Sequence, residues 1–283
     1  MQSNNPVFRR SDAFNGSGTN AYGNQTYPAN GAGYDGYGQD GPQAPVRSGE
    51  RMTIDSVVQK TAISLGIVIV TAAITWWWTG DLNASDENIS RLYLALMVGS
   101  FGAFGLSMVN SFKRVVSPPL VIAFAALEGV ALGAFSKFID ATFVQDSGLG
   151  SSIVMQAVLG TFAAFAGTLA AYKFFNIKVS SKFRTFVVAA MFGMVALGLL
   201  DVVLGFFSNS IGVFGFGGIG LLFSVAGLVL GIFMLILDFD FVEQGIAAGV
   251  EERESWRAAF AMTVSLVWIY TNLLRILAIF SQD

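Results

Sequence analysis

The sequence predicts an all-α integral membrane protein with about seven transmembrane helices behind an N-terminal tail. Of its 283 residues, 54% are hydrophobic and only 12% are charged, whereas a soluble domain carries about 25% charged residues. Several apolar runs reach the roughly 18 to 20 residues that cross about 30 Å of hydrocarbon. These runs are continuously apolar rather than alternating, which favours helices over the strands of a membrane barrel.

Residues 1–52 are predicted to form a disordered cytoplasmic tail, and residues 53–283 the membrane domain. The tail is rich in Gly, Asn, Ser, Tyr and Gln, and such a segment cannot bury enough apolar surface to offset its ordering entropy. A Tyr/Gly tract for self-association or partner docking is the alternative. The first 15 residues have no apolar signal-peptide core, so we expect the first spanning helix to direct insertion.

Seven apolar segments are predicted to span the membrane as helices, because each is close to the expected length. They lie at about 58–78, 92–110, 119–137, 152–174, 184–207, 216–237 and 257–280. Trp76, Trp77 and Trp78 end the first segment, as in an interfacial aromatic belt. The Gly- and Ala-rich fifth and sixth segments permit close helix packing.

Positive charge predicts the orientation of these segments. Lys and Arg are frequent near the first span and in the second, fourth and sixth connections, and scarce in the others. Since cytoplasmic loops carry the excess of positive charge, we expect the tail and the even-numbered connections to be cytoplasmic. The expected location is the plasma membrane, with the C-terminus outside unless the last segment is re-entrant.

Composition also excludes several classes of function. The chain has no Cys and no His, which excludes a Cys nucleophile, a disulfide framework and the usual zinc sites. It has no Walker loop, nucleophile elbow or His-based motif, so we expect neither an enzyme nor a resident cofactor. A net charge of −3 does not indicate a nucleic-acid partner. The expected partners are the lipid bilayer and other membrane proteins.

Ionisable residues at membrane depth are the candidate functional residues, because they are costly in hydrocarbon and usually face a cavity or a partner. Glu128 lies in the middle of the third span and Asp201 in the last third of the fifth. Each is either a structural hydrogen-bonding group or a proton- or cation-responsive group. Arg275, close to Asn272 in the last span, is expected either to snorkel to an interface or to pair with an acid.

Three acids, Asp238, Asp240 and Glu243, are predicted to end the sixth span. Asp240 and Glu243 share a face, whereas Asp238 and Asp240 point about 200° apart if the helix continues. Clustered carboxylates repel one another and favour a shared proton, and Asp238 with Asp240 could offer oxygen ligands to Ca²⁺. The alternative is a solvated helix end at the cytoplasmic surface.

Several motifs resemble the transmembrane Bax inhibitor motif family, most closely its bacterial branch. They are residues 5–8 near the start, 127–129 in the third span, 178–184 after the fourth, 237–245 after the sixth and 266–275 in the seventh. The resemblance implies a seven-helix fold whose last helix is surrounded by the other six. It also implies a pH-sensitive Ca²⁺ leak, closed by two hydrogen-bonded aspartates from the last two helices that share a proton.

The resemblance carries over only in part to the residues of this chain. Asp240 matches the sixth-span aspartate best, with Asp238 as runner-up, and the seventh-helix acid falls near Asn272, an amide that cannot titrate. Asp238, Asp240 and Glu243 therefore either supply the coupled pair themselves, or gating by pH is absent.

The leading hypothesis is a pH-sensitive leak channel for Ca²⁺ or another cation. The three acids of the sixth span would form its cytoplasmic site, Glu128 and Asp201 would line or brace the pathway, and Arg275 would be a counter-ion or gate. The alternative is a non-transporting membrane protein that modulates a membrane protease or a stress response through helix contacts.

Overall fold

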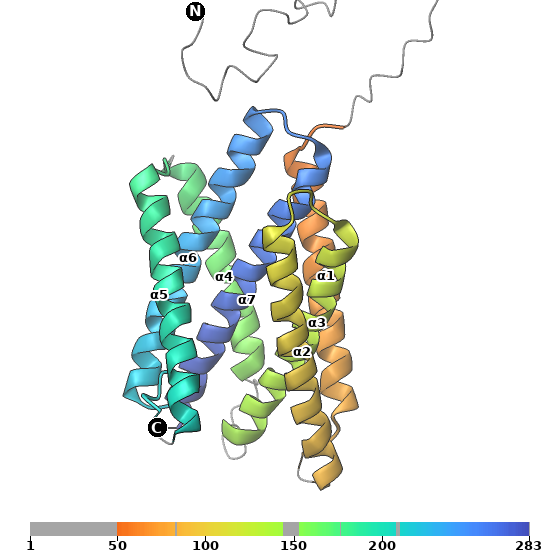
Figure 1. Cartoon of the computed structure of the whole chain (residues 1–283), viewed down its shortest axis with the longest axis vertical. Coiled ribbons are helices and arrows are strands. Elements are labelled where there is room, and N and C mark those ends of the chain that lie inside the picture. Colours follow the sequence, from red (N-terminus) through yellow and green to blue (C-terminus); the bar gives the residue numbers. More distant parts are fainter. Residues whose placement is uncertain (1–49, 83, 144–152, 176, 208–209, 283) are drawn as a thin grey trace, which may run out of the picture. The chain divides into compact units, whose positions relative to one another are not determined.

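The computed structural model describes residues 50–82, 84–143, 153–175, 177–207 and 210–282. These residues form seven long α-helices and one short 3₁₀-helix (Figure 1): α1 (Ile54–Trp78), α2 (Asp86–Phe112), α3 (Pro118–Phe143), α4 (Ile153–Phe174), α5 (Ser181–Phe206), α6 (Gly218–Ala247), η1 (Glu252–Glu254) and α7 (Ser255–Phe280). All seven α-helices are long and apolar enough to cross a membrane. The predicted all-α membrane fold is therefore confirmed, while residues 1–49 of the predicted tail lie outside the described residues.

The predicted spans coincide with these helices, and the largest difference is at the end of α6. This helix continues to Ala247, whereas the predicted span ends at 237. Asp238, Asp240 and Glu243 consequently lie on the helix itself, in its last three turns, and not beyond its end. The reason is that a spanning helix can continue past the hydrocarbon, where charged side chains find water and polar partners.

Hydroxyl side chains mark the beginnings of three helices. The Thr53 side chain accepts a hydrogen bond from the Ser56 amide, and the Ser56 side chain accepts one from the Thr53 amide, which completes a capping box for α1. Ser85 and Ser180 cap α2 and α5 in the simpler one-bond manner. These caps satisfy amides that have no partner within the helix.

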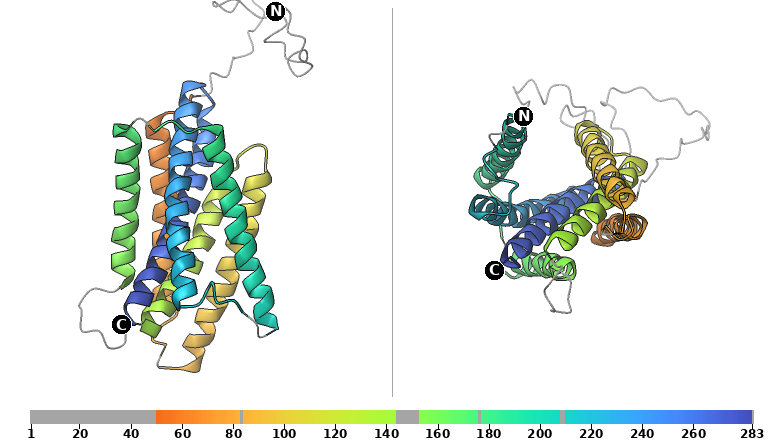
Figure 2. Two further views of the ribbon diagram at one scale, coloured as in Figure 1. Left: turned by 90° about the vertical axis from the view of Figure 1, so that its left-hand side faces the viewer. Right: turned by 90° about the horizontal axis from the view of Figure 1, so that it is seen from below.

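Helix α7 is the centre of the bundle and the most buried of the spanning helices. It packs against α1, α3, α4 and α6, while α2 packs mainly on α3 and α5 mainly on α6. Seen from below in Figure 2, the other helices are arranged around it. The last helix is therefore surrounded mainly by four helices that contact it directly. Helices α2 and α5 form an outer layer, in which α2 covers α3 and α5 covers α6.

Glycines allow the helices of this bundle to approach closely. A Cβ atom at Gly129 of α3 would lie 1.9 Å from Thr71 Oγ1 of α1, and Gly133 is similarly tight against the α1 backbone. On α6, a Cβ atom at Gly227 would lie 2.4 Å from Asn272 Oδ1 of α7. Small residues therefore allow the close crossings of α1 with α3 and of α6 with α7, as is common in membrane bundles.

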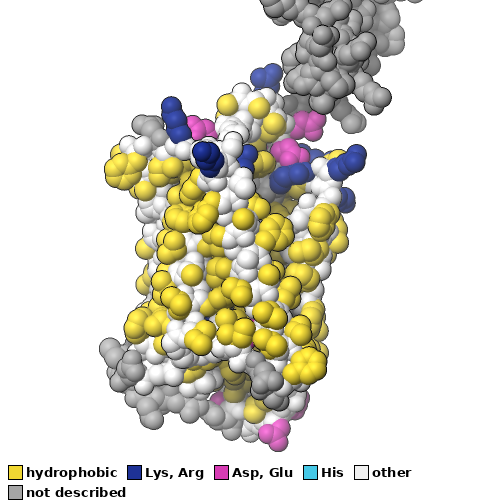
Figure 3. All heavy atoms as spheres, turned by 60° about the vertical axis from the view of Figure 1, so that its left-hand side comes forward, with side chains coloured by type: hydrophobic (Ala, Val, Ile, Leu, Met, Phe, Trp, Pro, Cys, Tyr) yellow, Lys and Arg dark blue, Asp and Glu magenta, His cyan; other side chains and the backbone are white. Residues whose placement is uncertain are grey.

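The surface divides into an apolar belt and a basic end. Figure 3 shows hydrophobic side chains over the middle of the bundle and Lys and Arg side chains gathered at one end. There Lys60 Nζ lies 2.6 Å from Glu252 Oε1, and Arg257 Nη2 donates to the Arg114 carbonyl at 2.7 Å. The start of α1, the connection between α2 and α3 and the connection between α6 and α7 therefore lie at the same end of the bundle. This is expected for helices that cross a membrane in alternating directions.

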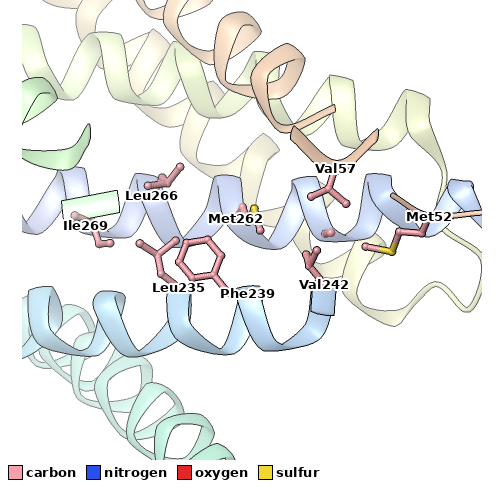
Figure 4. Packing of buried hydrophobic residues seen from close by; sticks show 9 residues of the cluster. Met52, Val57, Leu235, Phe239, Val242, Met262, Leu266 and Ile269 are labelled. Carbon is pink, nitrogen blue, oxygen red and sulfur yellow. The ribbon is translucent and has the colours of Figure 1, made fainter. Parts of the chain in front are cut away.

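Residues 50–52, which the sequence places in the tail, are bound to the connection between α6 and α7. The Met52 amide donates to the Val250 carbonyl at 2.9 Å, and the Glu252 amide donates to the Glu50 carbonyl at 2.7 Å. Met52 is buried in a hydrophobic cluster between α6 and α7 (Figure 4). Residues 50–52 are therefore attached to the helical bundle.

Candidate functional site

Asp238 of α6 faces the central helix. Its Oδ2 lies 2.5 Å from Ser265 Oγ of α7, and no charged side chain among the described residues forms an ion pair with it. Nearby hydrophobic residues of the two helices pack together in the cluster of Figure 4: Leu235, Phe239, Val242, Met262, Leu266 and Ile269. One acid and one hydroxyl therefore meet within a locally apolar part of the contact between α6 and α7.

The other two acids of this segment bind different helices. Asp240 is buried and accepts a hydrogen bond from Arg184 of α5 at 2.9 Å and one from Gln244 of its own helix at 2.6 Å. Glu243 accepts a hydrogen bond from Tyr172 of α4 at 2.6 Å. The acid-bearing segment, residues 238–243, consequently joins α6 to α4, α5 and α7 near the basic end.

The structure does not bring Asp238 and Asp240 together as ligands for Ca²⁺. The two residues are two positions apart on a continuing helix and point about 200° apart, one towards α7 and the other towards α5. Among the described residues no group of three or more Asp, Glu, His or Cys side chains could hold a metal ion, and Ca²⁺ takes roughly six to eight oxygen ligands. The predicted binding pair is therefore not formed.

Asn272 does not occupy the position on α7 that faces the acid. Its Nδ2 donates to the Trp268 carbonyl at 2.8 Å, and its side chain packs on Gly227 of α6. Seven residues, about 10 Å along a helix, separate Asn272 from Ser265. Ser265 is therefore the residue that meets α6 at the acid, and Asp238, the runner-up in the resemblance, is the aspartate that faces α7.

Asp201 binds the connection between α5 and α6 rather than a pathway. Its Oδ1 accepts hydrogen bonds from the Ile211 amide at 2.6 Å, the Gly212 amide at 3.0 Å and the Ser210 hydroxyl at 2.9 Å. The side chain is buried. Because a carboxylate can accept several hydrogen bonds at once, this acid shapes the loop at residues 210–214.

Arg275 of α7 binds the same loop from the inside of the bundle. Its Nη2 donates to the Val213 carbonyl at 2.7 Å and the Gly215 carbonyl at 3.3 Å, and its guanidinium lies 5.6 Å from the centre of the Phe214 ring. The residue is buried and forms no ion pair with any described acid. Its donors are therefore satisfied by loop carbonyls rather than by an acid of the described part of the chain.

Glu128 lies apart from these groups. It is half-buried on α3, next to Gly129 at the crossing with α1, and forms no hydrogen bond or ion pair with any described residue. The structure thus separates the predicted site residues into four places: the acid-bearing segment, the α5–α6 loop with Asp201 and Arg275, Asn272 against Gly227, and Glu128.

Sequence reasoning missed three residues that complete the site: Ser265, Arg184 and Tyr172. Ser265 is a small uncharged residue, and a single serine within an apolar span gives no signal of a site in the sequence. Arg184 and Tyr172 lie at the ends of their helices, where a basic or aromatic residue is also explained by the membrane interface. Only the register between helices reveals these partners.

The comparisons with known proteins agree with the fold. A family model described as Bax inhibitor 1 like matches residues 5–282, which includes the helical bundle and the acid-bearing segment. The comparison with curated proteins gave no match. With the match extending over nearly the whole sequence, the chain belongs to the Bax inhibitor 1 like family.

Proposed function

We propose that the protein is a non-enzymatic, pH-sensitive leak for Ca²⁺ or another cation in the plasma membrane of a bacterium. The observation that carries the proposal is the contact between Asp238 and Ser265, 2.5 Å apart at the interface of α6 and the central helix. Membership of the Bax inhibitor 1 like family supports it. The cation is the substrate of the leak and not a resident cofactor.

Protonation of Asp238 would control whether α6 and α7 stay together. A neutral carboxyl bound to the Ser265 hydroxyl brings no charge into the apolar contact. An ionised carboxyl does, and a charge in such surroundings is stabilised by water and cations. Low pH therefore favours the closed contact, and loss of the proton as pH rises favours entry of water and cations between the helices.

The remaining contacts of the acid-bearing segment would restrict this change to one side of α6. Arg184 neutralises Asp240 on the side of α5, and Tyr172 binds Glu243 on the side of α4. Neither contact involves α7. Ionisation of Asp238 would therefore loosen the contact with α7 while α6 remains attached to α4 and α5.

The positive-inside rule places the basic end, with the acid-bearing segment and the N-terminal tail, on the cytoplasmic side.

The direct test of the leak is Ca²⁺ entry into dye-loaded liposomes that contain only the purified protein. The pH range is about 5 to 8, a window that brackets the titration of carboxyl groups in apolar surroundings. Empty liposomes and retention of a large trapped dye are the controls for bilayer damage.

We expect Ca²⁺ entry that increases with pH while the large dye is retained. Entry no faster than in empty liposomes at every pH would contradict the leak. That result would favour the alternative, a membrane protein that acts on a membrane protease or a stress response through contacts with partner proteins.

A further inference from the structure

A cavity of about 510 Å³ lies between α1, α3, α4 and α7. Its volume is within the roughly 300–1,000 Å³ of ligand pockets in proteins. Its lining is almost entirely apolar and includes Leu65, Trp76, Met155, Phe162, Val267 and Tyr270. None of the acids of the candidate site lines it.

The cavity is a groove that opens sideways between α1 and α4. Both helices pack against α7 but not extensively against each other. Three residues at its mouth are about half exposed, namely Ile69 at 53%, Met155 at 56% and Phe162 at 50%. Because these helices are long and apolar enough to span a membrane, the groove opens towards hydrocarbon and not towards water.

The polar groups in the groove already have partners. Ser136 Oγ and Tyr270 OH lie 2.6 Å apart, and Thr161 Oγ1 donates to the Ala157 carbonyl at 2.8 Å. A polar occupant would gain few hydrogen bonds and would lose its own hydration. The chemistry of the lining therefore favours a purely apolar group.

The length of the groove matches one leaflet of a bilayer. Along α1 it runs from Leu65 to Trp76, and these eleven steps correspond to about 16 Å at the helical rise. Half of the roughly 30 Å hydrocarbon thickness is about the same. An acyl chain that enters from one leaflet would fill the groove from its interface to the middle of the membrane.

The interfacial end of the groove carries charges of both signs. Lys137 Nζ donates to the Trp76 carbonyl at 2.9 Å and lies 5.3 Å from the centre of the Trp76 ring. Asp81 and Asp140 act electrostatically on the same ammonium group. A cation with two nearby acids suits a head group that contains both a phosphate and an amine, rather than one with net negative charge.

We propose that this groove binds one acyl chain of a zwitterionic phospholipid such as phosphatidylethanolamine. The lipid would come from the leaflet opposite the basic end, because Trp76 lies at the far end of α1 from Ile54. Its chain would contact Val267 and Tyr270 of the central helix. The proposal does not depend on the leak activity.

Native mass spectrometry of the purified protein tests the proposal by counting retained lipids. Val158→Trp and Ala73→Trp fill the groove from α4 and α1, since both residues line it, whereas Ala163→Trp adds the same side chain to an exposed position on α4 outside the groove. We expect one retained phosphatidylethanolamine in the wild type and the Ala163 variant, and at least tenfold weaker retention in the two groove variants.

Fluorescence of the wild type provides a second measurement that does not depend on the folding of the Val158→Trp and Ala73→Trp variants. Phosphatidylethanolamine with brominated chains, added to the protein in micelles, should quench the Trp76 contribution saturably at low ratios, with Trp76→Phe defining that contribution. Absence of retained lipid in the wild type, equal retention in all variants, or quenching without saturation would overturn the proposal. Equal retention of phosphatidylglycerol would overturn the assignment of a zwitterionic head group.

Discussion

Asp238 Oδ2 of α6 lies 2.5 Å from Ser265 Oγ of α7, and this contact joins an acid of one helix to a hydroxyl of the other. Of the two groups only the carboxyl ionises, because a serine hydroxyl keeps its proton in water. A single carboxyl titrates in one step, whereas a coupled pair titrates in two. The proposed leak should therefore respond to pH in a single step.

Replacing Ser265 with Asp should change this response. In the Ser265→Asp variant two carboxyl groups would lie within hydrogen-bonding distance and would share a proton, so we expect the pH dependence of Ca²⁺ entry to broaden into two steps. Ser265→Asn is the control, because it has nearly the same size and does not titrate. Identical pH profiles for the two variants would contradict a direct contact with Asp238.

The ion pair between Arg184 and Asp240 should stabilise the packing of α5 on α6. The Arg184 side chain is 53% exposed and that of Asp240 only 11%, so solvent weakens the pair and Arg184→Gln should cost about 1 kcal/mol in the free energy of unfolding. Unfolding in detergent measures it, with Lys182→Gln as the matched control on an exposed neighbour.

The double variant Arg184→Gln with Asp240→Asn should recover part of this loss, because no buried carboxylate is then left without its cation. Losses that simply add would show that the two side chains do not interact.

Arg275 should hold the loop between α5 and α6 in place. Arg275→Met keeps the length of the side chain but removes its donors to the carbonyls of Val213 and Gly215. Hydrogen bonds to a charged group contribute about 1.5–3 kcal/mol, so amide exchange at residues 211–214 should accelerate about ten- to hundredfold. Arg253→Met, at an exposed position of η1, should leave that exchange unchanged.

The crossing of α1 and α3 should not tolerate a side chain at Gly129. The Gly129→Ala substitution would place a Cβ atom 2.3 Å from the Val68 carbonyl oxygen, which forces the two helices apart and lowers the thermal unfolding temperature. Gly105→Ala is the matched control, because a Cβ atom there meets nothing within 4 Å. Equal stability of the two variants would show that the helices are not in contact at this point.

The fold could be predicted from the sequence because the information for it is local. Length and continuous apolarity identify each spanning helix, and both are present in a single stretch of chain. The sequence predicts the end of the sixth span at residue 237, ten residues before α6 ends, because the first acid follows at Asp238. A helix can continue beyond the hydrocarbon, and in this protein it carries the acids to their partners on α4, α5 and α7.

The arrangement of the candidate site could be predicted only in part, because it depends on the register between helices. The divergence of Asp238 and Asp240 follows from helical geometry alone. Helical geometry alone does not predict that Ser265 rather than Asn272 contacts Asp238, because this depends on how the connection after α6 positions α7. The partners of Arg275 cannot be predicted for a similar reason: they are backbone carbonyls of a loop, which no side-chain pattern in the sequence reveals.

The most direct test of the central claim compares Asp238→Asn with Asp240→Asn in the same liposomes. Both substitutions remove one carboxylate of the acid-bearing segment, but of these two only Asp238 is hydrogen-bonded to α7. The account predicts that Ca²⁺ entry loses its dependence on pH between about 5 and 8 in Asp238→Asn and keeps it in Asp240→Asn. A pH dependence that survives in Asp238→Asn and disappears in Asp240→Asn would contradict it.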